Sequence, residues 1–550
     1  MKRNKILIFP MAVIGLSACA GAEDAPEVAQ GTAAAVSLQP APTMCLMPRV
    51  NVDPRRSLTV TDHNILIPAQ GGRDFSLTRV LTQLSNQSAN GSPSALTMFK
   101  QLWDTQNPAP GLGLGFNCAT SGGTPSVVNG FNYGCRAAEG TQATTNPATA
   151  LANYEAVALV NRFDLAPADG SHCGEYRIVF ENGRNVSSRS FLIMEAVLPN
   201  PNPSCGIAAC RPVQQWWANL TTITDPAIRA QKLEEFYFTG ISGFEPVVHY
   251  THFLDNGVSC GYGCATPGAT GQFRTNTFMQ SPWMLKEFKL KRTCRRVTIE
   301  PIPIRTAALA VDDGSTSLNA ASTTDTTIVC DLDFKPVSVK DNPFNDFFNA
   351  ASTHPLASAF VDHIDDQVAC LAINDVNGFG YCGLDDQFNH NESGALASPT
   401  TDYRTIFNAS PNNPSALRTS IQGALTAIGS SLTVENIVAR AEAQSCKGCH
   451  RHASDANLGG GIIFPNSDSG GFGFVHNTEQ VESGPDGLRF HISPALTDVF
   501  LPFRESVMEG FLTRSACVSC GDVVLDSAEK ASTTVTAGTS LRISGTRAIH

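Results

Sequence analysis

The sequence predicts an α+β protein in which a β-rich, disulfide-containing N-terminal region precedes a mostly α-helical C-terminal region. Short β-prone runs lie between clusters of Gly, Pro and Asn, as strands do; they occupy residues 156–160, 176–180, 191–198 and 297–299. Apolar residues also recur at helical spacing, at about 75–85, 95–105, 212–221 and 226–238. These elements follow no repeated βαβ order and no internal repeat of fixed period, which favours α+β.

The first 19 residues have the organisation of a secretory signal peptide. Lys2, Arg3 and Lys5 precede an apolar run from Ile6 to Leu16, which is shorter than the roughly 20 residues needed to span a bilayer. Leu16-Ser17-Ala18-Cys19 resembles a bacterial lipobox. The resemblance implies that Cys19 becomes the lipidated first residue of an exported protein. The alternative is an ordinary cleaved signal with an incidental cysteine.

Residues 20–43 are rich in Ala, Pro, Thr and Val without helical or strand periodicity, which predicts a flexible linker. By resemblance to enterobacterial sorting, Ala20 after the cysteine favours the outer membrane. The body is then expected in the periplasm or at the cell surface.

Length and charge limit the number of domains and the kinds of partner to be expected. A chain of 550 residues predicts two or three domains. The net charge of −11 excludes nucleic acid as an expected partner. The one basic run, 286–296, alternates charged with apolar residues and predicts a half-exposed strand.

Residues 341–430 predict a helical connecting region, with helices near 344–348, 354–372 and 413–428. An acidic loop at 374–386 lies beside Cys370 and Cys382. Its acidic residues do not fall at the alternating positions of an EF-hand, so the loop does not favour calcium. A disulfide-stapled surface loop fits it better.

A further helix is predicted over 433–445. Small or apolar residues at 434, 437, 438, 441 and 445 share one helical face. Thr433 suits the N-cap and Glu435 the first turn.

Directly after this helix come Cys446-Lys447-Gly448-Cys449-His450. Two thiols three residues apart can add across the vinyl groups of a haem, and the next imidazole can ligate its iron. With 17 Cys and 12 His in the chain, such a pattern arises by chance only about 0.01 times. A helix ending in this motif resembles the first helix of a class I cytochrome c. The resemblance implies one covalent haem c at Cys446 and Cys449, with His450 on the iron.

Two other chemistries remain open for the motif. Cys517 and Cys520 form a second C-x-x-C, so four thiolates would suit zinc. A plain disulfide between Cys446 and Cys449 also suits an oxidising compartment.

The sixth iron ligand is expected downstream. His476 follows a glycine-rich stretch, and Met508 resembles the distal methionine of small cytochromes c in its distance from the motif. His491 and His452 are weaker candidates, and an open sixth position is the further alternative. Pro502 is expected to start the helix that carries Met508, where a methionine is also a common core residue.

Fourteen cysteines remain after Cys19, Cys446 and Cys449 are set aside, an even number that suits disulfides. Short separations suggest the pairs Cys118–Cys135, Cys205–Cys210, Cys260–Cys264, Cys370–Cys382 and Cys517–Cys520.

The β-rich region contains no recognisable catalytic motif. His249 and His252 have a spacing that suits a metal, but on the strand expected there they would face opposite sides. Arg162 and Asp164 are expected to form a structural pair.

Together these features predict an exported, lipid-anchored c-type cytochrome that transfers single electrons to a periplasmic or membrane redox partner. The expected segments are a signal peptide (1–19), a linker (20–43), an α+β domain (44–340), a helical connection (341–430), a cytochrome c-like domain (431–520) and a tail (521–550). An electron carrier is favoured over a stand-alone enzyme. The alternatives are an oxidoreductase whose large domain passes electrons to the haem, and a non-haem binding or structural lipoprotein.

Overall fold

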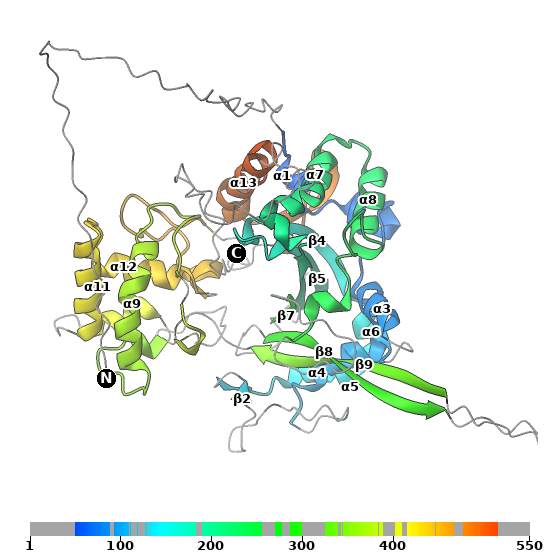
Figure 1. The fold of residues 1–550 in the computed structure, drawn as a ribbon, viewed down its shortest axis with the longest axis horizontal. Coiled ribbons are helices and arrows are strands. Elements are labelled where there is room, and N and C mark those ends of the chain that lie inside the picture. The colour runs from blue at the N-terminus through cyan, green and yellow to red at the C-terminus, as the bar shows by residue number, and fades with distance from the viewer. Residues whose placement is uncertain are drawn as a thin grey trace, which may run out of the picture. The chain divides into compact units, whose positions relative to one another are not determined.

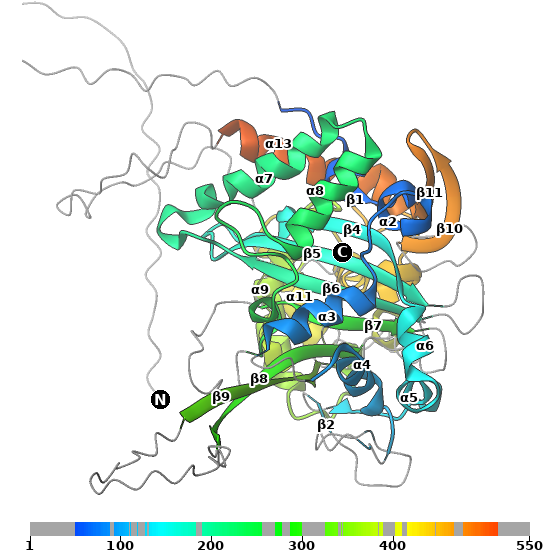
Figure 2. The ribbon, with the colours of Figure 1, turned by 90° about the vertical axis from the view of Figure 1, so that its right-hand side faces the viewer.

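A seven-stranded antiparallel sheet forms the framework of the β-rich region (Figure 1, Figure 2). Its strands, in spatial order, are β1 (Thr59–Val60), β4 (Glu155–Arg162), β5 (His172–Asn182), β6 (Ser190–Pro199), β7 (Gln272–Thr277), β8 (Lys286–Ile299) and β9 (Asp325–Ser338). Two further strands, β2 (Val127–Val128) and β3 (Phe131–Asn132), pair with each other. The strands predicted at 156–160, 176–180, 191–198 and 297–299 are confirmed.

The computed structural model describes residues 50–514, except 89–92, 109–110, 112–117, 119–126, 129–130, 183–189, 256–269, 278–285, 300–324, 339–342, 344, 383, 389–401, 410–414, 446 and 467–476. The predicted lipidation site Cys19, the linker 20–43, the tail 521–550 and the suggested pairs Cys260–Cys264 and Cys517–Cys520 lie outside these residues. The described residues belong to one compact unit. None of the described helices is both long and apolar enough to span a lipid bilayer.

The helices of the N-terminal region begin at residues that cap them. Ser76, Ser94 and Asp225 each accept a hydrogen bond from a backbone N–H of the first turn. The helices are α1 (Pro54–Ser57), α2 (His63–Leu66), α3 (Leu77–Gln87), α4 (Ala95–Asp104), α5 (Ala137–Thr144), α6 (Pro147–Ala152), α7 (Arg211–Asn219) and α8 (Pro226–Phe238). The four helices predicted from periodicity correspond to α3, α4, α7 and α8.

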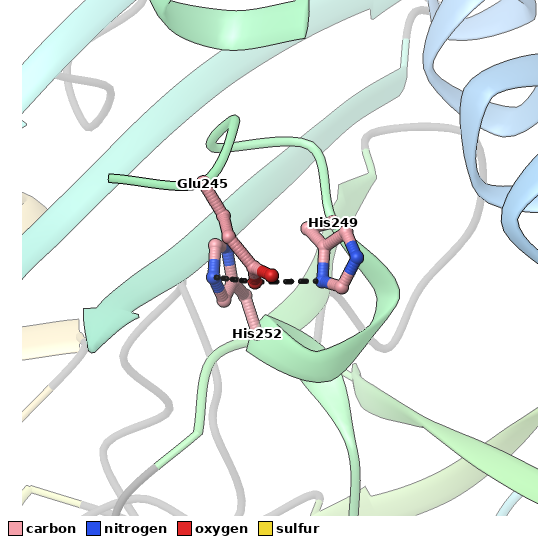
Figure 3. A group of neighbouring side chains, drawn as sticks. All are labelled: Glu245, His249 and His252. Atoms are coloured by element: carbon pink, nitrogen blue, oxygen red, sulfur yellow. Dashed lines mark ion pairs between the residues drawn. The ribbon is translucent and has the colours of Figure 1, made fainter. Parts of the chain in front are cut away.

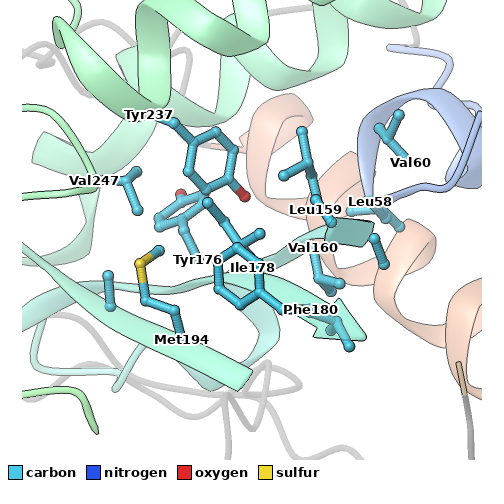
Figure 4. Close-up of a cluster of buried hydrophobic side chains, with 14 of the residues drawn as sticks. Leu58, Val60, Leu159, Val160, Tyr176, Ile178, Phe180, Met194, Tyr237 and Val247 are labelled. Carbon is cyan, nitrogen blue, oxygen red and sulfur yellow. The ribbon is translucent and has the colours of Figure 1, made fainter. Parts of the chain in front are cut away.

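Helices α7 and α8 pack on the central strands. The ring of Trp217 on α7 stacks on that of Tyr176 on β5, with centroids 5.9 Å apart, and the Tyr237 hydroxyl on α8 donates to the Arg177 carbonyl. Figure 4 shows Tyr237 and Val247 gathered with strand residues of this cluster. Every residue of β4 except Glu155 is buried, as expected for a strand covered on both faces.

The predicted half-exposed strand in the basic run is β8. It pairs with β9 along its whole length, and the Cys294–Cys330 disulfide joins the two strands. Lys286 is buried, whereas Lys291 is exposed. The start of the basic run therefore lies in the core, and charges further along it are in solvent.

A second hydrophobic cluster lies within the helical segment (yellow-green to yellow in Figure 1). Its helices are α9 (Ala357–Leu371), α10 (Tyr403–Asn408), α11 (Ala416–Ala427) and α12 (Val434–Ala443). The rings of Phe348 and Tyr403 stack at 4.2 Å between centroids. Helices predicted near 354–372, 413–428 and 433–445 are confirmed, and 345–348 forms a 3₁₀ turn.

The segment after α12 is less helical than predicted. Strands β10 (Asn477–Gly484) and β11 (Gly487–Ile492) form a hairpin before helix α13 (Leu501–Arg514). Its turn carries Asp486, which pairs with Arg56 at 2.8 Å and with Arg229 at 3.0 Å. These long-range ion pairs tie the hairpin to α1 and α8.

The disulfides correct part of the predicted pairing. Cys118–Cys135 and Cys370–Cys382 are confirmed. The Cys205–Cys210 pair is wrong, because Cys210 is bonded to Cys173 at the start of β5. The bond joins residues that are distant in sequence but brought together by the packing of α7 on the sheet.

Candidate functional site

Helix α12 leads directly into the C-x-x-C-H motif. The Thr433 hydroxyl accepts from the Asn436 N–H at 3.2 Å, and the Asn436 side chain accepts from the Thr433 N–H at 3.0 Å. This reciprocal pair is a capping box, which fixes the first turn of the helix. The N-cap role predicted for Thr433 is confirmed. All but two residues of α12 are buried, so the helix is held by its packing as well as its cap.

A buried guanidinium holds the last turns of α12 in place. Arg440 has no exposed surface, and its nitrogens donate five hydrogen bonds of 2.9–3.0 Å. The acceptors lie on both sides of the helix in sequence: the carbonyls of Leu371, Ile373, Leu458 and Gly459, and the side chain of Asn374. The segment after α9 and the loop after the motif are therefore both joined to α12.

The chain turns sharply after α12. The Ser445 hydroxyl donates to the Glu442 carbonyl at 2.7 Å and accepts from the Gly448 N–H at 3.0 Å. The next turn, Gly448–His452, has π-helical hydrogen bonding, which is often found at functional sites. A Cβ on Gly448 would overlap the carbonyl oxygen of Glu442. Position 448, directly before Cys449, must therefore be glycine for this turn to close.

Cys449 faces the protein interior. Its exposed fraction is 1 %, and it belongs to the same contiguous hydrophobic cluster as Phe464 and Met508. Met508 lies on α13 and is fully buried. The second motif cysteine is thus part of the hydrophobic core.

A buried arginine on α13 interacts electrostatically with this cysteine. Arg504, one helical turn before Met508, has its Nε 3.7 Å from Asp164 Oδ2. Burial and the neighbouring Arg162 lower the pKa of Arg504 to about 9, although Asp164 and the Cys449 thiol act in the opposite direction.

The predicted structural pair of Arg162 and Asp164 is confirmed, with hydrogen bonds of 2.8–3.1 Å. Burial alone would raise the pKa of Asp164, but Arg162 and Arg504 outweigh it and lower that pKa. Arg162 Nη1 is buried and has no hydrogen-bond partner among the described residues. Arg162 Nη1 can therefore donate a hydrogen bond to a further acceptor.

A second charged network lies on the other side of the turn. His452 Nδ1 is 2.5 Å from Glu442 Oε1, and its Nε2 is 3.3 Å from Asp402 Oδ2. Arg404 donates to Glu442 through its backbone N–H at 3.0 Å and its guanidinium at 3.1 Å. The hydrogen bond to Glu442 raises the pKa of His452.

The pKa values of the two carboxyl groups in this network, Glu442 and Asp402, shift in opposite directions. Burial would raise the pKa of Glu442, but hydrogen bonds from His452, Asp402 and Arg404 lower it well below its usual value. Burial and the nearby Glu442 raise the pKa of Asp402. Glu442 is therefore the carboxylate that holds the charge. It was missed in the sequence, although a Glu between Ala441 and Ala443 on a buried helix is an indication of a buried ion pair.

Only some of the predicted haem ligands lie within the described residues. Cys446 and His476 lie outside them, and for His450 the backbone alone is described. Met508 and Cys449 lie in one cluster. His491 Nδ1 is 2.6 Å from Glu482 in the β10–β11 hairpin, and His452 pairs with Glu442. The two weaker candidates are thus held by carboxylates.

His249 and His252 are not on a strand, so the prediction that they face opposite sides is wrong. His249 precedes a 3₁₀ turn, Tyr250–Phe253, that contains His252. Both imidazoles lie next to the carboxylate of Glu245 (Figure 3). A three-residue spacing brings side chains together on such a turn and separates them on a strand.

Searches of protein-family models, curated proteins and solved structures found no match to this chain.

Replacing Gly448 by alanine is expected to destabilise the protein by about 2 kcal/mol, because the new methyl group overpacks against Glu442. Gly423→Ala is the control: it lies within α11 with open space around a Cβ, so it should gain up to about 1 kcal/mol. Urea unfolding of both variants measures the difference. Equal effects of the two substitutions would contradict the packing of the turn.

Glu442→Gln is expected to lower the free energy of unfolding at pH 6 by about 3 kcal/mol, as for other buried pairs that lose one partner. Because the folded-state pKa of Glu442 is lowered, its stabilisation is present above its unfolded pKa and is lost as the pH falls through the folded value. The gap to the wild type should therefore narrow below about pH 4.5.

Glu435→Gln is the matched control on the same helix. Glu435 pairs with Arg418 but its side chain is 48 % exposed, so its loss should cost about 1 kcal/mol or less. Denaturant titrations from pH 6 to pH 3 compare the three proteins. A gap for Glu442→Gln that does not depend on pH would show that Glu442 carries no charge in the fold.

Proposed function

We propose that this protein is an exported, lipid-anchored c-type cytochrome that passes single electrons through one covalent haem. In this proposal Cys446 and Cys449 form the thioether bonds, His450 ligates the iron, and residues 431–520 form a cytochrome c-like domain. Cys19 carries the lipid, with the outer membrane favoured, and the partner is a periplasmic or membrane redox protein.

The observation that carries the proposal is the position of Cys449. It follows a capped helix by a tight turn and is buried rather than on the surface. The turn that carries it admits only glycine at position 448, so the fold holds this cysteine in one place. The same arrangement supplies apolar side chains around the attachment point.

The charged groups near Cys449 suit the rest of a haem. Arg504 is buried with a lowered pKa, and Arg162 Nη1 is without a hydrogen-bond partner among the described residues. Arg162 Nη1 can therefore donate to a further acceptor, and Arg504 lies beside the same Asp164 that Arg162 binds. Haem propionates are carboxylates, which guanidinium groups bind well. Arg504 and Arg162 are therefore the side chains that we assign to the propionates.

Met508 is one candidate for the distal ligand; it lies on α13, four residues after Arg504. His476 remains the other candidate. The haem, when bound, supplies a one-electron redox couple whose potential depends on its axial ligands and their surroundings. The protein supplies the attachment, the dry cluster around it and the neighbouring charges.

Protein produced in a host with haem-maturation machinery should show a c-type reduced-minus-oxidised spectrum. The double variant Cys446→Ser/Cys449→Ser should lose that band, because both thioether bonds are removed. The control Cys370→Ser/Cys382→Ser removes a surface-loop disulfide and should keep the band. Colourless wild-type protein would remove the redox function.

Arg504→Gln should keep the covalent haem but lower its reduction potential, since a buried positive charge favours the reduced state. Arg295→Gln is the control, because that side chain is 66 % exposed on β8 and solvent screens its charge. Redox titration of the purified proteins measures the shift. A potential unchanged by Arg504→Gln would remove that arginine from the haem surroundings.

A further inference from the structure

A second group of side chains with ligand chemistry lies in the segment between α8 and β7. Glu245, His249 and His252 each direct one ligand atom toward the others, and these atoms all lie within 4.8 Å of one another (Figure 3). Glu245 Oε2 is 3.3 Å from His249 Nδ1 and 3.9 Å from His252 Nε2. The donors of a tetrahedral zinc site are roughly 3.4 Å apart, so small side-chain rotations would bring them to that spacing.

The tautomer of His252 is fixed by its backbone contact. Its Nδ1 is 3.0 Å from the Val247 carbonyl oxygen. Because a carbonyl only accepts, Nδ1 carries the proton and Nε2 carries the lone pair. A metal-binding histidine typically has this arrangement, in which a carbonyl orients the ring through the nitrogen that does not bind.

The Nε2 lone pair of His252 has no hydrogen-bond donor among the described residues. The side chain has no exposed surface, and Nε2 has no hydrogen-bond partner among the described residues. Its distance of 3.9 Å from Glu245 is too long for a hydrogen bond. Burial also lowers the pKa of His252 to about 4, so the ring is neutral at neutral pH. A buried acceptor that points into a cluster of other ligands is best satisfied by a cation.

The other two side chains, Glu245 and His249, are accessible to an ion from solvent. Glu245 is 61 % exposed and His249 is partly exposed, so an ion can reach the cluster from solvent. His249 Nδ1 lies 2.6 Å from the Thr251 hydroxyl. This hydroxyl can rotate away, because it is a rotor rather than a fixed backbone donor.

The cluster of Asp402, Glu442 and His452 is different, although it also has three ligand types. Both nitrogens of His452 already face carboxylates, and Arg404 adds a positive charge to Glu442. Unlike His252 Nε2, neither ring nitrogen of His452 is without a partner among the described residues.

We propose that Glu245, His249 and His252 bind one Zn²⁺ ion and leave a fourth position for water. Three protein ligands with an exchangeable fourth position are the arrangement found in catalytic zinc sites, whereas structural zinc sites have four protein ligands. The site is separate from the C-x-x-C-H motif in its residues and in its chemistry, so it stands whether or not haem is attached there.

The test uses the full-length protein, freed of metal with a chelator and titrated with Zn²⁺ by calorimetry. The wild type should bind one Zn²⁺ per chain at this site. Glu245→Gln and His249→Gln should each weaken that binding at least tenfold. Glu245 is exposed, so its substitution is the one least able to disturb the fold. Circular dichroism verifies that each variant is folded.

His491→Gln is the matched control, since His491 is also paired with a glutamate, at 2.6 Å, but has no second histidine beside it. It should bind zinc as the wild type does. Failure of the wild type to bind zinc would overturn the proposal. So would binding that Glu245→Gln and His249→Gln leave unchanged.

Discussion

The buried guanidinium of Arg440 is the contact on which the geometry of the candidate haem site depends. A charged group with no exposed surface is stable only when its donors are paired, and here all the acceptors belong to the chain on either side of α12. Four of the five are backbone carbonyls, so the contact specifies the path of the chain rather than one side-chain pair. The loop after the motif must return to α12 so that its carbonyls can accept hydrogen bonds from Arg440. The turn that holds Cys449 lies inside that closed path.

Opposite charges lie on the two sides of this turn. Glu442, with its lowered pKa, is a carboxylate next to His452 and Arg404, whereas Arg504 is a buried guanidinium that interacts electrostatically with Cys449. Charges act more strongly in a dry interior than in water. A redox centre attached at Cys449 would therefore have its potential set by groups that solvent does not screen. This is the physical link between the fold and the proposed electron transfer.

Local periodicity predicted most of the regular structure. The strands around 156–198, the helices α3, α4, α7 and α8, and the capped helix α12 all follow from patterns within 8 to 15 residues. The β10–β11 hairpin was missed because its strands are polar, although Pro485-Asp486-Gly487 is a turn sequence that indicates it.

What the sequence did not predict depends on contacts between distant residues. Cys210 pairs with Cys173 rather than with Cys205, because the packing of α7 on β5 decides which thiols meet. The site residues show the same limit. Thr433 could be recognised as a cap, but the proximity of Arg504 to Cys449 joins two helices separated by a hairpin. The paired orientation of His249 and His252 required a 3₁₀ turn where the apolar residues around it indicated a strand.

Mass spectrometry of peptides from protein matured in a haem-attaching host tests the central claim most directly. We expect the peptide containing Cys446 and Cys449 to be heavier by one haem, with both sulfurs in thioether bonds. The same two cysteines recovered unmodified, joined to each other, or bound to zinc would contradict the account.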